Sequence, residues 1–372
     1  MLVAASEKIN AIIQGEGPQK DALPASLDHW RFCKKMGSGA FGSVYKYTRH
    51  ENTSQDRNKG NRRIERTSNG RVCKVYHKNV PATVYRNELD MAQRIKHLQN
   101  ENLVTVVEVQ RQVPGKQDCI VMECVDSNLQ RLINPHLPLE KGLLAKMVWG
   151  TKQLIQQTWN YCQGVELDQR LVPDYSRQIL NGLTYLHRQR IIHSDLKPEN
   201  ILVNTATNQL KITDYGSSQK FWPLQQSASP HSFTLLFAPP ELFEPENQLS
   251  SFWVWGLSTL TGVSGGMASY KADIFAAGCI FFMMRTKKYV EILGLNHSKE
   301  PVILHEVKQK PDGLRKKITT ELAAHGIQQN PNPALDEVIL ISLSYKPEHR
   351  PSAEALSKQL EQELFQGDSQ RH

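Results

Sequence analysis

The sequence predicts an α+β fold with a small β-rich lobe followed by a larger, mostly helical lobe. In the first third of the chain, short runs of β-forming residues alternate with turn residues, and one helical pattern interrupts them. In the remainder, apolar residues recur at helical spacing. The length of 372 residues agrees with two structural units, since domains typically hold roughly 100–200 residues. A chain of this size buries a core that needs no disulfide or metal for stability.

The β-rich lobe is expected to span residues 29–124 and to contain one main helix. Residues 1–28 form a leader with scattered glycine, proline and serine, which is either loose or a short docked helix. Strands are predicted at Ser43–Thr48 and Arg71–Tyr76, because both runs alternate and are rich in β-formers. The polar run Glu51–Gly70 between them predicts a solvated loop.

The predicted helix and two further strands complete this lobe. Apolar residues recur at helical spacing within Val84–Leu98, which predicts a helix with one buried face. Strands are predicted at Val104–Val109 and Cys119–Val125, on either side of a Pro114-Gly115 turn.

The helical lobe is expected to span residues 125–365, with a short tail at 366–372. Its strongest pattern is an amphipathic helix that begins near Tyr175 and ends at His187. Further helices are predicted at Lys271–Arg285, Pro333–Leu343 and Ser352–Phe365.

Composition limits the class and location of the protein. Hydrophobic residues make up 39% of the chain and charged residues 22%, which excludes bulk disorder and fibrous classes. The net charge of +8 permits an acidic partner without requiring one. The six cysteines include no CxxC pair and no zinc-spaced cluster, so they predict reduced thiols. The N-terminus lacks the apolar core of a signal peptide, and the longest apolar run, Ile274–Met284, is too short to span a bilayer. We therefore expect a cytoplasmic protein, with the nucleus as the alternative.

The first motif with chemical meaning is Gly37-Ser38-Gly39-Ala40-Phe41-Gly42-Ser43-Val44, which fits the pattern G-x-G-x-x-G-x-V. Glycines let the backbone approach a phosphate closely because no Cβ intrudes. A dinucleotide-binding site needs a helix directly after the third glycine, and a strand is predicted here instead. Taken alone, the motif fits a phosphate-binding loop and a plain glycine-rich hairpin equally well.

The second motif is more specific. Residues 193–200 have the sequence His-Ser-Asp-Leu-Lys-Pro-Glu-Asn and precede the apolar strand Ile201–Val203. Asp214-Tyr215-Gly216 then supplies a second acidic turn. Ordinary polar loops would not explain why two aspartates, a lysine and an asparagine occur in the order that phosphoryl transfer needs.

With these elements the chain resembles the eukaryotic-type protein kinases over roughly Trp30–Leu360. Six signatures occur in order: Lys74 for the V-A-I-K lysine, residues 193–200 for H-R-D-L-x-x-x-N, Asp214-Tyr215-Gly216 for D-F-G, Pro239-Pro240-Glu241 for A-P-E, residues 273–278 for D-x-W-x-x-G, and Arg350 for the late buried arginine. The resemblance implies the bilobal protein-kinase fold, with an ATP cleft between the lobes and a hinge near Cys124.

The resemblance also implies roles for the charged residues. Lys74 should hold the α and β phosphates of ATP, with Glu88 as its helical partner and Asp90 as the second choice. Both carboxylates could otherwise belong to a solvated helix face. Asp195 should orient the substrate hydroxyl and accept its proton, while Lys197 should meet the γ-phosphate.

ATP and Mg²⁺ are the cofactors that the resemblance implies. Asn200 and Asp214 are the expected Mg²⁺ ligands, which suits a cation held by few protein oxygens and several phosphate oxygens. The expected nucleotide contacts are the loop glycines, the residues that sandwich adenine, the gatekeeper and the hinge: Gly37, Gly39 and Gly42; Val44, Val72 and Leu202; Met122; and Glu123, Cys124 and Val125.

The acceptor is expected to be a serine or threonine of a protein substrate. The D-L-K-P-E-N wording and Thr234 resemble Ser/Thr kinases rather than tyrosine kinases. Thr234 and the Pro-Pro-Glu element also favour protein substrates over small molecules or lipids. His193 is expected to be a packed scaffold residue, and Glu241 and Arg350 to form a structural ion pair.

Four features depart from the family. Ser194 replaces the arginine that commonly clamps a phosphorylated activation loop, so we expect activity not to require a phosphate bound by this residue. Three segments are long: Glu51–Gly70, Asn134–Arg170 and Leu242–Ala268. The first is basic, and a solvated loop is favoured over a docking site for acidic partners or nucleic acid. The third carries aromatic residues that would either dock a partner or pack against the helical lobe.

The alternative function is a pseudokinase or scaffold that binds nucleotide with little catalysis. Lys74, Asp195, Asn200 and Asp214 are all intact, which favours catalysis. A nucleic-acid partner is not expected, because no recognition motif accompanies the basic loop.

Overall fold

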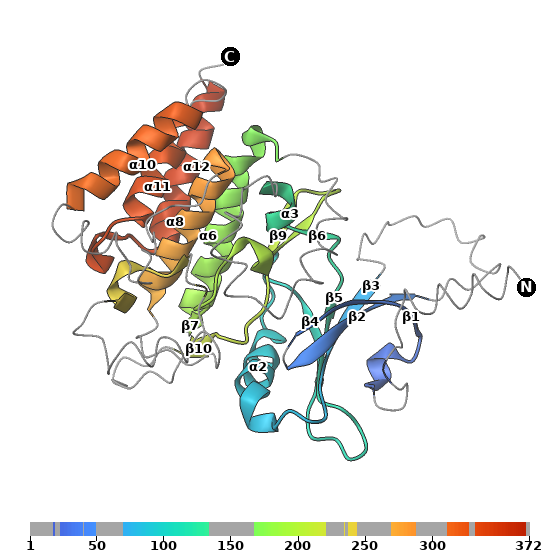
Figure 1. Cartoon of the computed structure of the whole chain (residues 1–372). Helices are drawn as coiled ribbons and strands as arrows, with labels where there is room; N and C mark the ends of the chain where they lie inside the picture. The colour runs from blue at the N-terminus through green and yellow to red at the C-terminus, as the bar shows by residue number, and fades with distance from the viewer. Residues whose placement is uncertain are drawn as a thin grey trace, which may run out of the picture. The chain divides into compact units, whose positions relative to one another are not determined.

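A computed structural model describes residue 18 and residues 23–39, 41–49, 70–133, 167–220, 234, 237–243, 269–287, 311–326 and 332–369 (Figure 1). Most of the three long segments named above therefore lies outside the described residues. The chain divides into two compact units. Unit 1 comprises Met1–Gln99 and Leu103–Asp126, and unit 2 comprises Asn100–Asn102 and Ser127–His372.

Unit 1 is built on a five-stranded antiparallel sheet of order β1-β2-β3-β5-β4 (Figure 1). The strands are β1 (Trp30–Ser38), β2 (Gly42–Arg49), β3 (Gly70–Tyr76), β4 (Val106–Gln110) and β5 (Cys119–Glu123). Helix α2 (Ala82–Ile95) packs against β4 and β5. It is shorter than the predicted 84–98 at its C-terminal end, and it begins directly after Pro81.

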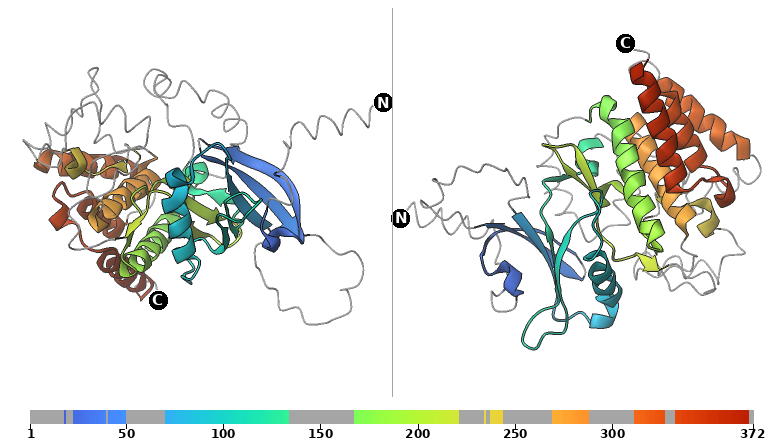
Figure 2. Two further views of the ribbon diagram at one scale, coloured as in Figure 1. Left: turned by 90° about the horizontal axis from the view of Figure 1, so that it is seen from below. Right: turned by 180° about the vertical axis from the view of Figure 1, so that it is seen from behind.

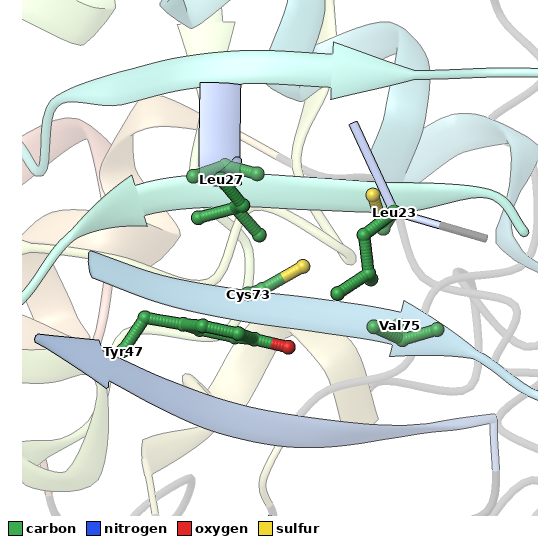
Figure 3. Close-up of a cluster of buried hydrophobic side chains, with 7 residues drawn as sticks. Leu23, Leu27, Tyr47, Cys73 and Val75 are labelled. Atoms are coloured by element: carbon green, nitrogen blue, oxygen red, sulfur yellow. The ribbon is translucent and has the colours of Figure 1, made fainter. Parts of the chain in front are cut away.

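One face of this sheet is covered by the N-terminal segment. Side chains alternate between the two faces of a strand, so Cys73 and Val75 share a face. A 3₁₀ turn at Ala25–Leu27 places Leu27 over this face, together with Leu23 (Figure 3). Both leucines are buried, and the Lys116 ammonium donates a hydrogen bond to the carbonyl oxygen of Leu23 at 3.1 Å. The part of the leader from Leu23 onwards is thus packed into unit 1.

The opposite face of the sheet carries four of the residues expected at the nucleotide. Directly paired residues of neighbouring strands share a face. Lys74 pairs with Val44 on β2, and Val72 pairs with Met122 on β5. Since Lys74 and Val72 are two positions apart on β3, all four side chains belong to one face of the sheet.

Unit 2 is mainly helical. Its long helices are α6 (Val172–Arg188), α8 (Tyr270–Thr286), α10 (Pro311–Gly326), α11 (Pro333–Ser342) and α12 (Ala353–Ser369). Helix α6 packs against α8 and α12, and α8 also packs against α10 and α11 (Figure 2). Four of these helices correspond to ranges predicted from the sequence, whereas α10 was not predicted. In the part of α10 whose burial is described, the buried apolar residues are Ile318 and Leu322.

Short strands in unit 2 frame the loops that carry the second motif. The strands β6 (Ser127–Asn128), β8 (Ile201–Asn204) and β9 (Gln209–Ile212) form one sheet, and β7 (Ile191–Ile192) pairs with β10 (Gln219–Lys220). Helix α3 (Leu129–Ile133) packs beside β8. Residues 193–200 therefore connect β7 to β8, and the Asp214 turn connects β9 to β10.

A three-residue segment from the first third of the chain is anchored in unit 2. The amide of Asn102 donates to Gln178 and to the carbonyl oxygen of Leu210, both at 3.2 Å, and its own carbonyl accepts from the Ile212 amide at 2.9 Å. Helix α6 lies close to this segment, since a Cβ added at Gly182 would lie 3.0 Å from the carbonyl oxygen of Asn102. Asn102 is nearly inaccessible to solvent, and a buried polar side chain requires such hydrogen-bond partners.

Helix α8 is the core of unit 2. Its residues from Asp273 to Thr286 are all buried, which matches the apolar run at Ile274–Met284. Ser269 caps its first turn by accepting a hydrogen bond from the Ala272 amide at 3.1 Å. Among the described helices, none combines the length and the hydropathy needed to cross a membrane.

Candidate active site

The Lys74 ammonium forms an ion pair with the Glu88 carboxylate in unit 1. Lys74 lies on the central strand β3, and because Cys73 and Val75 point into the covered face, its side chain points to the other one. Glu88 lies on α2 next to Leu89, which is buried. Asp90, the second choice from the sequence, pairs with Arg111 instead. The two carboxylates therefore have different partners, and Glu88 is the one at Lys74.

The glycine-rich motif forms the hairpin between β1 and β2. The Gly39 amide donates to the Gly42 carbonyl at 2.8 Å, and β2 begins at Gly42, so the helix of a dinucleotide-binding site is absent at this position. Gly42 is required by the fold, because a Cβ there would lie 2.6 Å from the carbonyl oxygen of Val75. No described atom lies within 4 Å of a Cβ added at Gly37 or Gly39, so the protein itself does not impose glycine there.

A chain of side-chain hydrogen bonds holds this hairpin to the end of β3. The hydroxyls of Ser38 and Ser43 are 2.8 Å apart, and Ser43 lies 3.1 Å from Nε2 of His77. The amide of His77 also donates to the carbonyl oxygen of Phe41 at 2.9 Å.

The expected hinge follows β5. Met122 and Glu123 end this strand, and Cys124 and Val125 come directly after it. The amide of Cys124 donates to the Gly70 carbonyl at 3.3 Å, which ties the segment to the start of β3. Burial raises the pKa of the Cys124 thiol, and the nearby Lys46 ammonium partly offsets this rise. Leu202, the remaining expected adenine contact, lies on β8 in unit 2.

In unit 2 the side chains of Asp195, Lys197 and Thr234 form one hydrogen-bonded set. The Lys197 ammonium donates to Oδ2 of Asp195 at 2.6 Å and to Oγ1 of Thr234 at 3.0 Å. The Thr234 hydroxyl donates to Oδ1 of Asp195 at 2.7 Å. Both carboxylate oxygens of Asp195 are therefore held in place. These three residues span positions 195–234 of the sequence and meet here.

Asn200 and Asp214 supply oxygen atoms in the same unit. The Asn200 amide nitrogen donates to the Asp195 carbonyl at 2.9 Å, which assigns the amide oxygen as the atom available to a cation. The Thr213 amide donates to the Asn200 carbonyl at 2.9 Å, so the residue before Asp214 is bonded to Asn200. The Asp214 carboxylate is exposed, and its backbone has a φ of 62°. Two oxygen donors and no soft ligand fit Mg²⁺ better than zinc or copper.

Asp273, near the start of α8, supports the loop of residues 193–200. Its carboxylate accepts hydrogen bonds from the amides of His193 at 2.8 Å and Ser194 at 2.9 Å. Nε2 of His187 lies 2.9 Å from the same carboxylate. Ser194 has a φ of 68°, a strained value for serine, and these bonds hold it there. From the sequence, Asp273 was expected only as part of a signature, without this function. An aspartate directly before the apolar run Ile274–Met284 was the available signal, because a buried charge needs partners.

His193 is a scaffold residue by its contacts. Its ring is fully buried, with Nε2 3.0 Å from the Thr213 carbonyl and Nδ1 accepting from the Asp195 amide at 3.3 Å. It also packs edge-on against Tyr215. Both ring nitrogens thus bind backbone, which aligns the two acidic turns.

Glu241 and Arg350 form a bidentate ion pair. The two guanidinium nitrogens of Arg350 donate to the two carboxylate oxygens of Glu241 at 2.7 and 2.8 Å, and Arg350 is fully buried. The remaining donors of Arg350 bind the carbonyl oxygens of Ser344, Tyr345 and Lys271. A buried arginine needs this degree of saturation.

The chain belongs to the protein kinase family, since a family model described as "protein kinase domain" matches residues 30–360. Its β-rich first region and helical second region are those of the bilobal kinase fold.

Two relatives support this placement. The chain is 26% identical to cyclin-dependent kinase 4 of Xenopus laevis over 267 residues, which cover 68% of this chain and 62% of that protein. It is 32% identical to myosin light chain kinase 3 of Danio rerio over 136 residues, which cover 33% of this chain and 16% of that protein. The matches thus span less than two thirds of the length of each relative.

Proposed function

We propose that this chain is an active protein kinase that transfers the γ-phosphate of ATP to serine or threonine hydroxyls of protein substrates. The observation that carries the proposal is the hydrogen-bonded set of Asp195, Lys197 and Thr234. A pseudokinase has no need of an aspartate whose two carboxylate oxygens are held in place beside a lysine. The intact pair of Lys74 and Glu88 in unit 1 supports the same conclusion.

Each residue then has a chemical role. The carboxylate of Asp195 orients the substrate hydroxyl and accepts its proton while the oxygen bonds to the γ-phosphorus. At the same time the bond from the γ-phosphorus to the bridging oxygen of ADP breaks. The Lys197 ammonium stabilises the negative charge of the transferred group, and Lys74, oriented by Glu88, holds the α and β phosphates.

Asn200 and Asp214 would hold Mg²⁺ through the oxygens described above. When bound, the cation neutralises phosphate charge. Phosphoryl transfer depends on positioning and charge stabilisation, so these two residues and Lys74 are expected to matter for rate.

Thr234 supports a Ser/Thr acceptor. Its hydroxyl fills the space between Asp195 and Lys197, and the resemblance to Ser/Thr kinases places a threonine at this position. We propose protein substrates on the same ground, with a peptide library as the probe of sequence preference.

The test is transfer of labelled phosphate from ATP and Mg²⁺ to a generic protein substrate. Asp195→Asn and Asp214→Asn should each abolish most of the label, because one removes the proton acceptor and the other a metal ligand. Asp28→Asn is the matched control, since Asp28 is exposed and lies outside the site. Equal labelling by the wild type and both site variants would contradict the proposal and favour the scaffold alternative.

Two further expectations concern partners and location. We propose that residues 242–268, which lie mostly outside the described residues, dock a protein partner. Deleting 248–266 should then reduce phosphorylation of the natural substrate more than that of a generic peptide.

We propose a cytoplasmic location, with the nucleus as the alternative, because Cys33, Cys73, Cys119, Cys124 and Cys279 are free thiols. Cell fractionation tests this, and recovery from a secretory compartment would contradict it.

A further inference from the structure

Helix α2 carries a second set of contacts to the sheet beside the pair of Glu88 and Lys74. We infer that Tyr85 is a positioning residue, which with Tyr76 and Asp118 holds α2 where Glu88 meets Lys74. The inference rests on the proposed function and extends it to regulation. It implies that the helix is held by this chain alone, without an activating partner.

The first contact is an aromatic stack. The rings of Tyr85 on α2 and Tyr76 on β3 are 4.0 Å apart between centroids and inclined by 11°. Tyr76 lies two residues after Lys74, on the same face of the strand. Tyr85 lies three residues before Glu88, on the same face of the helix. The stack thus runs parallel to the ion pair, between the same strand and the same helix.

The second contact is a hydrogen bond at the far edge of the Tyr85 ring. Its hydroxyl donates to Oδ2 of Asp118 at 3.1 Å. Asp118 is fixed in turn, because its Oδ1 accepts from the Gln112 amide at 2.6 Å and its carbonyl from the Tyr76 amide at 3.0 Å. Burial raises the pKa of the Tyr85 hydroxyl, and Asp118 adds to the rise, so the hydroxyl stays a donor at neutral pH.

Burial distinguishes this contact from a second contact of the helix, the ion pair of Asp90 with Arg111. Tyr76 and Tyr85 are 2% and 8% exposed. The pair of Asp90 with Arg111 also links α2 to the end of β4, but its side chains are 47% and 38% exposed. Solvent screens such a pair, so it contributes little. Of these two contacts, the tyrosine contact therefore contributes more to the placement of the helix, and the ion pair of Asp90 serves as its control.

The consequence concerns the pairing of Glu88. All residues of the tyrosine contact and of the Glu88–Lys74 ion pair lie in unit 1. Rotation or withdrawal of α2 would break the stack and the hydrogen bond together with the Glu88–Lys74 pair. The helix is thus held in the pairing position before any partner binds, and the purified chain should show basal activity on its own.

The first experiment compares Tyr85→Phe, Tyr85→Ala and Asp90→Asn. Hydrogen exchange of the α2 amides is the readout that does not depend on activity. Tyr85→Ala should speed exchange across residues 82–95 and lower kcat roughly 10-fold or more, because it removes both stack and hydrogen bond. Tyr85→Phe keeps the stack and should lower kcat only a few-fold, and Asp90→Asn should match the wild type. Unchanged exchange and unchanged kcat in Tyr85→Ala would overturn the inference.

The second experiment separates positioning from general stability. Tyr85→Ala is placed in a Glu88→Gln background. If Tyr85 acts through Glu88, the second change should lower the melting temperature but leave the residual kcat unaltered. An equal further loss of kcat in that background would show that Tyr85 acts elsewhere and would overturn the inference. If the wild type transfers no phosphate but α2 still exchanges faster in Tyr85→Ala, the proposed function is refuted, whereas the positioning of α2 by Tyr85 stands.

Discussion

Removal of the Asp273 carboxylate tests how the catalytic loop is held. Asp273 is 1% exposed and accepts hydrogen bonds from the amides of His193 and Ser194, at 2.8 and 2.9 Å, with His187 as a third partner at 2.9 Å. The change to make is Asp273→Asn, which keeps the shape of the side chain. Asparagine has one acceptor oxygen, and its NH₂ group faces donors.

The expected loss in the free energy of unfolding follows from these hydrogen bonds. A hydrogen bond to a charged group contributes about 1.5–3 kcal/mol, and a buried donor left without a partner adds a desolvation penalty of about 1–3 kcal/mol. Asp273→Asn loses at least one such bond, so we expect a drop of about 2–4 kcal/mol in the free energy of unfolding. Domains are stable by only about 5–15 kcal/mol, so the change is large. Ser194 also loses support for its φ of 68°, and kcat should fall about 100-fold as Asp195 shifts.

Urea unfolding at neutral pH, followed by the circular dichroism of the helices, measures the stability, and phosphate transfer measures kcat. Asp168→Asn is the control, because Asp168 pairs with Arg170 at the surface and its loss should leave the midpoint nearly unchanged. A midpoint shift in Asp273→Asn no larger than that of the control would refute the reasoning.

Three further predictions concern packing, backbone and pH. Gly182→Ala should lower the free energy of unfolding by about 1–3 kcal/mol, because its Cβ would lie 2.8 Å from Cδ1 of Ile212 and 3.0 Å from the carbonyl oxygen of Asn102; an unchanged urea midpoint would contradict this. Ser194→Gly should raise it by about 0.5–1 kcal/mol, since glycine adopts a φ of 68° without strain, and a lower melting temperature would be the contrary result. Burial raises the pKa of Tyr47 above that of an unfolded tyrosine, so the unfolded state ionises first and stability should fall as the pH rises above about 10. Tyr47→Phe should flatten that slope at little loss of stability, because the Tyr47 hydroxyl has no hydrogen-bond partner among the described residues; an unaltered slope between pH 9 and 11 would count against it.

Four of the five strands of the unit 1 sheet and four of the five long helices of unit 2 could be predicted, because their apolar residues follow the period of the element. Strand β1 (Trp30–Ser38) was not predicted, since none of its side chains is fully buried. The alternation of Arg71–Tyr76 places Lys74 on one face and Cys73 on the other, as β3 does. Helix α10 was not predicted because, among its side chains whose burial is described, only Ile318 and Leu322 are buried, so its apolar pattern shows little periodicity.

The residues of the site could be named because kinase signatures are short and ordered along the chain. Their supports could not be named in the same way. Asp273 bonds to residues 79 and 80 positions away, and Tyr85 bonds to a residue 33 positions away. Such partners depend on which loops and strands meet in the folded chain. No local sequence pattern predicts these long-range contacts, so the function of Tyr85 could not be predicted from the sequence.

The N-terminal segment that covers one face of the sheet in unit 1 bears on where the kinase domain begins. The family match starts at residue 30, yet Leu23 and Leu27 lie before it and are buried. A fragment cut at residue 30 would bare the apolar surface around Cys73 and Val75, the face that Figure 3 shows beneath the two leucines. Exposed apolar patches of this kind promote aggregation. We therefore expect a fragment that starts at Leu23 to remain in solution better than one that starts at residue 30, where the family match begins.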